Sequence, residues 1–115
     1  MKLQAIAAAQ AFYHINREYE LMDIELDDYL VVHDFARDDI VIVKPVQLER
    51  PIVNSAEGLI SRREFEKVVD YLLDVIEDVD MFFRFDIMHV YITKEDRALV
   101  RLHVNVSPYE EEEDE

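Results

Sequence analysis

The sequence predicts an α+β fold (α/β in the broad sense), in which helices pack on a mixed central sheet of about five strands. Three observations predict it: a helical pattern at the start, Ile/Val-rich runs in the middle and near the end, and a second helical pattern between those runs. The expected order is α-β-β-β-α-β-β. A chain of 115 residues supports one core. We therefore expect a single domain over 1–108, followed by a disordered acidic tail at 109–115.

The first half of the chain predicts one helix and three strands. Apolar residues recur at helical spacing over 2–17, among strong helix formers. Apolar and acidic residues then alternate over 19–27, which is typical of a strand with one polar face. That face would hold Asp23, Glu25 and Asp27. A second strand is expected over 29–32, and the continuous Ile/Val run at 40–44 predicts a central strand covered on both faces.

The second half predicts a loop, a helix and a hairpin. Residues 47–60 contain a proline and the only glycine, which favours a loop. Ser61-Arg62-Arg63-Glu64 fits the S-x-x-E capping box, and apolar residues follow at helical spacing over 65–79. Strands over 84–93 and 99–106 form the expected hairpin, and the second of them alternates between apolar and polar residues.

Composition and charge narrow the functional classes. The formal charge is −15, and the six acidic residues at 110–115 account for six of these charges, which leaves −9 for the rest. Phosphate contacts supply most non-specific nucleic-acid affinity, so this charge disfavours nucleic-acid binding. The absence of cysteine excludes disulfides and thiolate chemistry. No apolar run reaches membrane-spanning length, and we expect a cytoplasmic protein.

The candidate site centres on a lysine that ends the central strand. Lys44 closes the Ile/Val run, and the acidic residues Glu25 and Asp27 stand upstream. This is the skeleton of a metal-dependent nuclease site. Sites that resemble it carry a second carboxylate two residues before the lysine. Two carboxylates are needed because Mg²⁺ is a hard cation that a single carboxylate holds loosely. Ile42 occupies that position, and its side chain cannot coordinate a metal.

Three local matches accompany this skeleton. Arg84-Phe85-Asp86-Ile87 is similar to an R-F-D strand start, Glu57-Gly58-Leu59 to an E-A-V motif before the second helix, and the run 40–44 to V-x-V-E-V-K. In this order they resemble the YraN-like family of predicted endonucleases. That family has the restriction-endonuclease-like, PD-(D/E)xK fold, whose core is helix, three strands, helix, strand. The resemblance covers nearly the whole chain up to the acidic tail.

The resemblance implies roles for particular residues. In active members an aspartate and a glutamate hold magnesium, while the lysine positions or activates water. Glu25-Leu26-Asp27 would match the family's E-I-D, with Asp27 as metal ligand, and Lys44 would match its lysine. Asp28 can replace Asp27 in this alignment. A carboxylate could also come from elsewhere: Glu18, Glu20, Asp34 or Glu57. Mg²⁺ or Mn²⁺ is expected only in that case.

Structural interpretations compete with these roles. The acidic alternation fits any half-exposed strand, and Lys44 before Pro45 fits the end of a buried strand, with its stem covered and its amine in water. Our leading hypothesis is a catalytically degenerate nuclease homologue that acts by binding an unknown protein partner. One alternative is an active endonuclease with a migrated carboxylate. Another is an acidic interaction protein that mimics nucleic-acid charge. Self-association through an exposed edge of the last strand also stays open.

Overall fold

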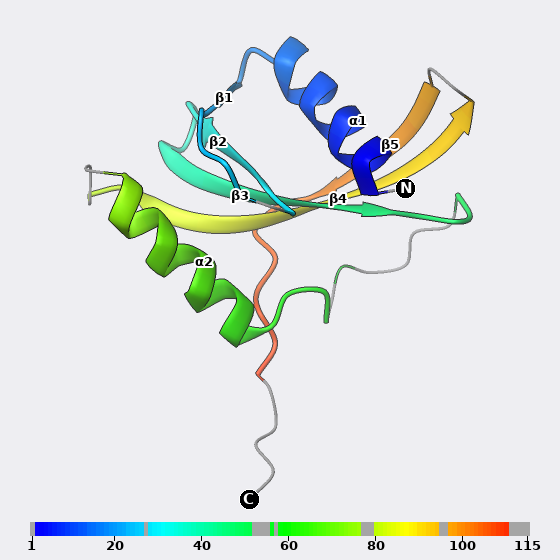
Figure 1. Ribbon diagram of the computed structural model, residues 1–115. Helices are drawn as coiled ribbons and strands as arrows, with labels where there is room; N and C mark the ends of the chain where they lie inside the picture. The colour runs from blue at the N-terminus through cyan, green and yellow to red at the C-terminus, as the bar shows by residue number, and fades with distance from the viewer. Residues whose placement is uncertain are drawn as a thin grey trace, which may run out of the picture.

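A computed structural model describes residues 2–26, 28–51, 56, 58–76, 80–94 and 97–110 (Figure 1). Its elements are α1 (Lys2–Ile15), β1 (Tyr19–Leu21), β2 (Leu30–Asp34), β3 (Asp39–Gln47), α2 (Arg62–Val75), β4 (Phe82–Lys94) and β5 (Arg97–His103). The α+β class, the order of elements and the five-stranded mixed sheet are as predicted.

The five strands lie in the sheet in chain order, from β1 to β5. Strands β1, β2 and β3 form an antiparallel meander, and β5 pairs antiparallel with β4. Between these pairs, β3 and β4 run parallel. Parallel neighbours need a crossover connection, and α2 supplies it. Figure 1 shows the result as three layers, with α1 on one face of the sheet and α2 on the other.

The sheet separates two hydrophobic cores, and β3 contributes to both. Val41 and Val43 pack on the α1 face, together with small residues of α1. Ile40 and Ile42 pack on the α2 face. All four are at most 1% exposed. A strand covered on both faces has no polar side to present, which explains its continuous Ile/Val run.

The start of α2 matches the predicted capping residue. The hydroxyl of Ser61 accepts a hydrogen bond from the Glu64 amide at 3.0 Å, which satisfies one free donor of the first turn. The Glu64 carboxylate turns towards the sheet, as described below. The helix ends at Val75, where the Ile76 amide bonds the Leu72 carbonyl at 2.8 Å. Val79, in the predicted helical pattern, lies outside the described residues.

The predicted strand over 19–27 is wrong beyond Leu21. After β1 the chain continues as an irregular segment, tied to β2 by a 2.9 Å bond from the Met22 amide to the Val31 carbonyl. Met22, Ile24 and Leu26 pack on the core beneath α2. The alternation therefore reflects a segment that packs its apolar side chains on the core without forming a ladder. Asp27 lies outside the described residues.

The segment between the strands expected over 29–32 and 40–44 is a tight hairpin. Strand β2 continues to Asp34 and β3 begins at Asp39, so four residues make the turn. The Asp34 carboxylate accepts the Ala36 amide at 3.0 Å, and Asp38 takes a φ of 58°. Aspartate favours such turns because its side chain bonds nearby amides and tolerates this backbone conformation. Asp34 therefore ends β2, and Asp39 begins β3.

After β5 the chain crosses to the start of α2. Asn105 has a φ of 57°, and the next amide, of Val106, bonds the Phe85 carbonyl at 2.8 Å. Farther on, the Tyr109 amide bonds the Ile60 carbonyl and the Tyr109 carbonyl accepts the Arg62 amide, both at 2.9 Å. Two residues of the predicted tail, Tyr109 and Glu110, therefore contact the α2 region. Residues 111–115 lie outside the described part.

Candidate functional site

Lys44 lies near the end of β3 and is held on the α2 side of the sheet. Its Nζ donates to the Leu59 carbonyl at 2.7 Å and to Oε2 of Glu64 at 2.9 Å. The second carboxylate oxygen of Glu64 lies 3.3 Å away. Both side chains are partly covered, with 26% of Lys44 and 23% of Glu64 exposed. The lysine that the sequence singles out is thus fully engaged by acceptors.

Tyr29 completes this group, which we call the Lys44 cluster: Tyr29, Lys44 and Glu64. The Tyr29 hydroxyl donates to the Glu64 carboxylate. Burial would raise the pKa of Glu64, but the hydrogen bonds from Tyr29 and Lys44 outweigh it and lower that pKa. Burial and the bond to Glu64 raise the pKa of Tyr29. At neutral pH the cluster therefore holds an ion pair and a neutral phenol.

An open groove adjoins this cluster. It encloses about 670 Å³ between the segment that precedes β2 and the first turns of α2. Its polar lining residues are Glu25, Asp28, Tyr29, Ser61, Arg63, Glu64, Lys67 and Tyr71. Lys44 is not among the lining residues and reaches the groove only through its partners. The lining mixes acidic and basic groups, so it does not form the uniformly positive surface that would attract a polyanion.

The structure brings some of the predicted site residues together. Glu25 lines the groove beside the Lys44 cluster, whereas Asp27 is outside the described residues. Ile42 is fully buried in the core beneath α2, so no carboxylate stands at that position. The carboxylate beside Lys44 is Glu64, which sequence reasoning used only as a capping residue. Glu64 is 20 residues from Lys44 in the sequence, so no local sequence pattern predicts their contact.

The four proposed sources of a migrated carboxylate have different positions. Asp34 lies on the opposite face of the sheet, bound to Arg84. Glu18 and Glu20 are exposed at the β1 edge. Glu57 is outside the described residues. None of the described members of this set is among the hydrogen-bond partners of Lys44.

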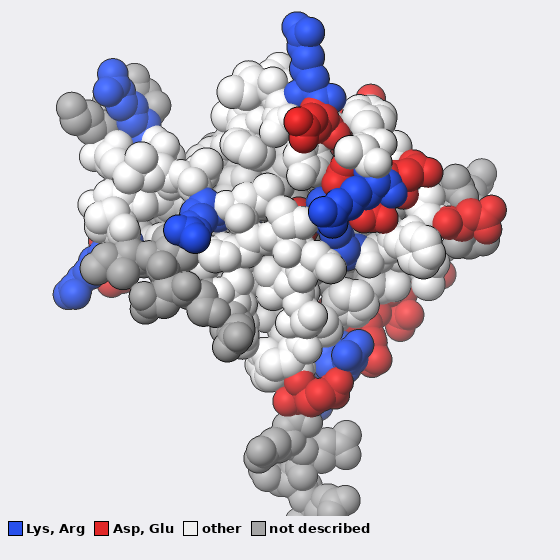
Figure 2. All heavy atoms as spheres, turned by 180° about the vertical axis from the view of Figure 1, so that it is seen from behind, with Lys and Arg blue, Asp and Glu red and all other residues white. Residues whose placement is uncertain are grey.

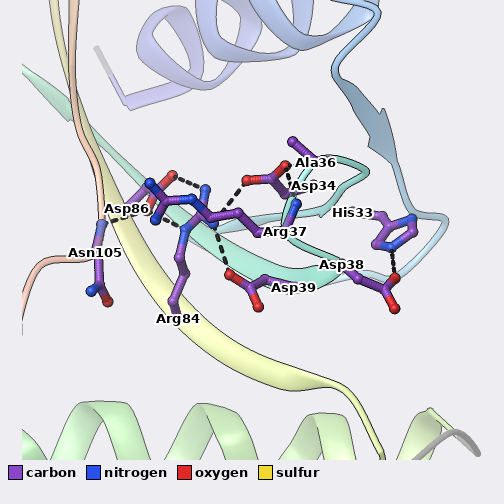
Figure 3. Close-up of polar contacts among 9 residues, drawn as sticks. All are labelled: His33, Asp34, Ala36, Arg37, Asp38, Asp39, Arg84, Asp86 and Asn105. Atoms are coloured by element: carbon purple, nitrogen blue, oxygen red, sulfur yellow. Dashed lines mark hydrogen bonds and ion pairs between the residues drawn. The ribbon is translucent and has the colours of Figure 1, made fainter.

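A second polar group lies on the α1 face (Figure 3). Sequence reasoning named Arg84 and Asp86 only as part of a motif and Asp34 only as a possible metal-site carboxylate, and did not predict that they meet. We call this group the Arg84 cluster: Asp34, Asp39, Arg84 and Asp86. Nη1 of Arg84 lies 2.8 Å from Asp34 and 2.9 Å from Asp39. Its Nε lies 3.1 Å from Asp86. The end of β2, the start of β3 and two positions of β4 supply these residues.

The centre of the Arg84 cluster is closed to solvent. Asp86 is fully buried, and its Oδ1 also accepts the Asn105 amide at 2.8 Å. Burial opposes the charge of Arg84, but its aspartates outweigh this and raise its pKa. Burial likewise opposes the charge of Asp34, yet bonds from Arg84 and from backbone amides lower its pKa. Arg84 and Asp34 therefore stay ionised in a site that a substrate cannot reach.

Helix α1 covers this cluster with Tyr13. Its ring is 1% exposed and stacks edge-on against Tyr19, with ring centroids 5.1 Å apart. Burial, together with the charges of Asp86 and Asp34, raises the pKa of Tyr13. Its hydroxyl has no hydrogen-bond partner within the described part of the chain. The Arg84 cluster is therefore a buried structural network in which the phenol stays neutral.

Two histidines meet across β4 and β5. His89 Nδ1 lies 3.0 Å from His103 Nε2, and the two rings are almost perpendicular. Burial is the main cause that lowers both pKa values, with Arg101 adding to it. No histidine spacing in the sequence predicted this pair. Among the described residues, no group of three or more His, Cys, Asp or Glu side chains could hold a metal ion.

Surface charge is unevenly distributed. Figure 2 shows acidic side chains gathered on the side of the hairpin between β2 and β3. Lys and Arg side chains are more widely scattered, and much of this face is uncharged. Within the described residues, neither helix has the length and apolar character required to cross a membrane.

Searches among protein-family models, curated proteins and solved structures found no match to this chain. The fold class and strand count described above therefore rest on the structure alone. The relation to the YraN-like family stays a prediction, carried by the sequence motifs and the order of the elements.

Proposed function

We propose that this chain is a catalytically degenerate relative of the YraN-like nucleases that acts as a binding domain. One observation carries the proposal: Ile42 is completely buried where a metal-binding carboxylate would stand, two residues before Lys44. An apolar side chain in a packed core leaves no room for a bound cation and its waters.

The contacts of Lys44 support the same conclusion. A lysine that activates water must direct its ammonium at the reacting centre. Here Nζ bonds the Leu59 carbonyl and the Glu64 carboxylate, so it anchors the start of α2 to the sheet. The lowered pKa of Glu64 fits this role, because an ionised carboxylate strengthens the ion pair.

The second candidate is an active nuclease whose carboxylate has migrated to Glu64. This residue comes from a different element than the missing acid and lies 2.9 Å from Lys44. It also lines the groove that Glu25 faces. Two carboxylates at one groove can hold Mg²⁺ or Mn²⁺ more firmly than one, while the ion keeps several of its waters. The charge-mimic hypothesis stays a prediction that no contact of the described residues favours.

A plasmid-nicking assay with Mg²⁺ or Mn²⁺, paired with calorimetric titration of Mn²⁺, tests the proposal on the full chain. We expect no nicking by the wild-type protein and only weak, non-stoichiometric Mn²⁺ binding from the acidic tail. Glu64→Gln and Lys44→Met should leave both results unchanged.

The control variant is Glu20→Gln, which removes an exposed acid from the β1 edge. Metal-dependent nicking that persists in Glu20→Gln and disappears in Glu64→Gln and Lys44→Met would overturn the binding proposal. That pattern would establish the migrated-carboxylate nuclease in its place.

A further inference from the structure

The outer edge of β5 is open. This strand is last in the sheet, and within the described residues it pairs only with β4. On β4 the Val90 carbonyl accepts an amide from the β3 side, and the Phe85 carbonyl accepts one from the β5 side. Backbone groups of successive strand residues point to alternate sides, so odd-numbered β4 residues face β5. The β5 residues paired with them therefore form hydrogen bonds to β4, and these residues are Leu99, Arg101 and His103. The alternate β5 residues direct their amides and carbonyls away from the sheet, and these are Ala98, Val100 and Leu102.

Apolar surface accompanies this edge on both faces of the sheet. Leu99 is 58% exposed and Val100 is 39% exposed. A groove of about 490 Å³ runs between α1 and the hairpin of β4 and β5. Its lining includes Ala7, Ala8, Ala11, Ile15, Ala98 and Val100. An added strand could thus bury side chains on both faces while its backbone pairs with β5.

The charge of this edge is opposite to that of the chain. Arg97 and Arg101 are the only charged residues of β5, in a chain with a formal charge of −15. Both are exposed. Arg101 shares the face that carries Leu99, because strand residues two apart lie on the same side, and Arg97 at the start of the strand also lines the groove beside α1. The acidic residues of the adjoining turn, Glu95 and Asp96, lie outside the described part.

These charges decide between possible occupants. Two copies that paired antiparallel around Leu99 would set Arg97 of one opposite Arg101 of the other, and like charges directly opposite are destabilising. The net charge of each copy would add repulsion. An acidic strand from another protein avoids the first obstacle, because its carboxylates would lie opposite Arg97 and Arg101, and these close ion pairs are screened less than the more distant net charge of the chain.

We propose that β5 receives an extended acidic segment of a partner protein, which pairs with the edge as a sixth strand. Its acidic side chains lie against Arg97 and Arg101, and its alternate apolar side chains enter the groove beside α1. This inference names the partner chemistry of the binding role proposed above and rests on that role.

Fluorescence anisotropy tests it on the full chain at low salt. The probes are dye-labelled peptides of identical length in which valine alternates with glutamate or with lysine. We expect saturable binding of the glutamate peptide and at least tenfold weaker binding of the lysine peptide. Raising the salt concentration should weaken the glutamate complex, because the ion pairs are exposed.

Two sets of variants separate backbone pairing from charge. Val100→Pro removes an outward amide without touching the bonds to β4, and should weaken binding tenfold or more, whereas Val100→Thr keeps the amide and the affinity. Arg97→Glu with Arg101→Glu should reverse the peptide preference. The control Arg37→Glu alters an exposed arginine in the hairpin at the opposite end of the sheet and should change nothing.

Several outcomes would overturn the inference: no binding of the glutamate peptide, equal binding of both peptides, or full affinity in Val100→Pro. Sedimentation that shows a dimer lost in Val100→Pro would also overturn it, since a second copy would then occupy the edge. Nicking activity would refute the proposed function while leaving the peptide result readable.

Discussion

The two polar clusters lie on opposite faces of the same sheet and differ in exposure and composition. The Arg84 cluster holds three carboxylates around one guanidinium, and Asp86 within it is fully buried. The Lys44 cluster holds one ion pair at the rim of an open groove, with each charged side chain about a quarter exposed. The lysine at the end of the central strand drew attention to the Lys44 cluster, yet the Arg84 cluster holds more buried charge. A charge that cannot reach water depends on its partners, whereas one at a rim can be hydrated instead.

The largest expected effect comes from Arg84→Met. This change leaves Asp34 and Asp86 buried without their counter-ion, and breaking a buried pair typically costs about 3–5 kcal/mol. We expect the free energy of unfolding, measured by urea denaturation, to fall by that order. A loss of less than about 1 kcal/mol would show that water reaches the cluster. Simultaneous Arg84→Met and Asp86→Leu should recover part of the loss, because one stranded charge is removed.

Lys44→Met should cost less, about 1 kcal/mol, because a partly exposed ion pair contributes little and Glu64 can be rehydrated from the groove. The same urea experiment measures it. The size-matched pair of lysine and methionine keeps the aliphatic stem packed, so the loss reports the charge. If Lys44→Met destabilised as much as Arg84→Met, the contrast between a closed and an open cluster would be wrong.

The smallest expected effect concerns how the stability of the fold depends on pH, because each cluster contributes over its own pH range. Asp34 and Glu64 both have lowered pKa values in the folded state, from ordinary values of 3.8 and 4.5. The unfolded chain therefore binds protons first on acidification. The stabilisation by each carboxylate is complete above its ordinary value and is lost as the pH falls through its folded value. The urea midpoint of the wild type, measured between pH 3 and 7, should fall as the pH is lowered. Glu64→Gln should remove the part of this fall that occurs at higher pH, and Asp34→Asn should remove the part that occurs at lower pH.

The histidine pair adds a separate window. His89 and His103 have pKa values lowered from 6.5, so their neutral forms are favoured by folding. Their contribution is full above that value and declines as the pH falls below it, because the unfolded chain is protonated first. His89→Gln should reduce the pH dependence of the urea midpoint just below pH 6.5 and leave the pH dependence due to the carboxylates unchanged. An unchanged slope there would mean that the pair titrates alike in both states.

Much of the fold could be predicted because its signals are local. The helical spacing before Ile15, the Ile/Val run of β3 and the capping residue Ser61 each fix an element without knowledge of the rest. The strand predicted beyond Leu21 failed for the opposite reason. Its alternation is real, but its apolar residues pack on the core without ladder bonds, and only the tertiary structure decides between these arrangements.

The site was harder to predict, because its contacts join distant residues. Lys44 and Glu64 meet only because α2 begins above the end of β3. Asp34 and Arg84 meet because the parallel pairing of β3 and β4 brings the β2–β3 hairpin next to the start of β4. One signal was available: Arg84 and Asp86 are two residues apart in a stretch, Phe82 to Met88, that is otherwise apolar, so both charges must lie on one covered face. Charges at such positions require partners, which the sequence does not name.

The bridge between Tyr109 and Ser61 has a consequence for synthesis of the chain. Translation delivers α2 well before residues 104–110, yet those residues provide the amide for Asp86 and the backbone bonds beside the first turn of α2. During elongation Asp86 therefore lacks one of its hydrogen-bond donors, and the start of α2 lacks the segment that pairs beside it. The domain should complete its structure only after this segment has left the ribosome and made these contacts on both faces of the sheet.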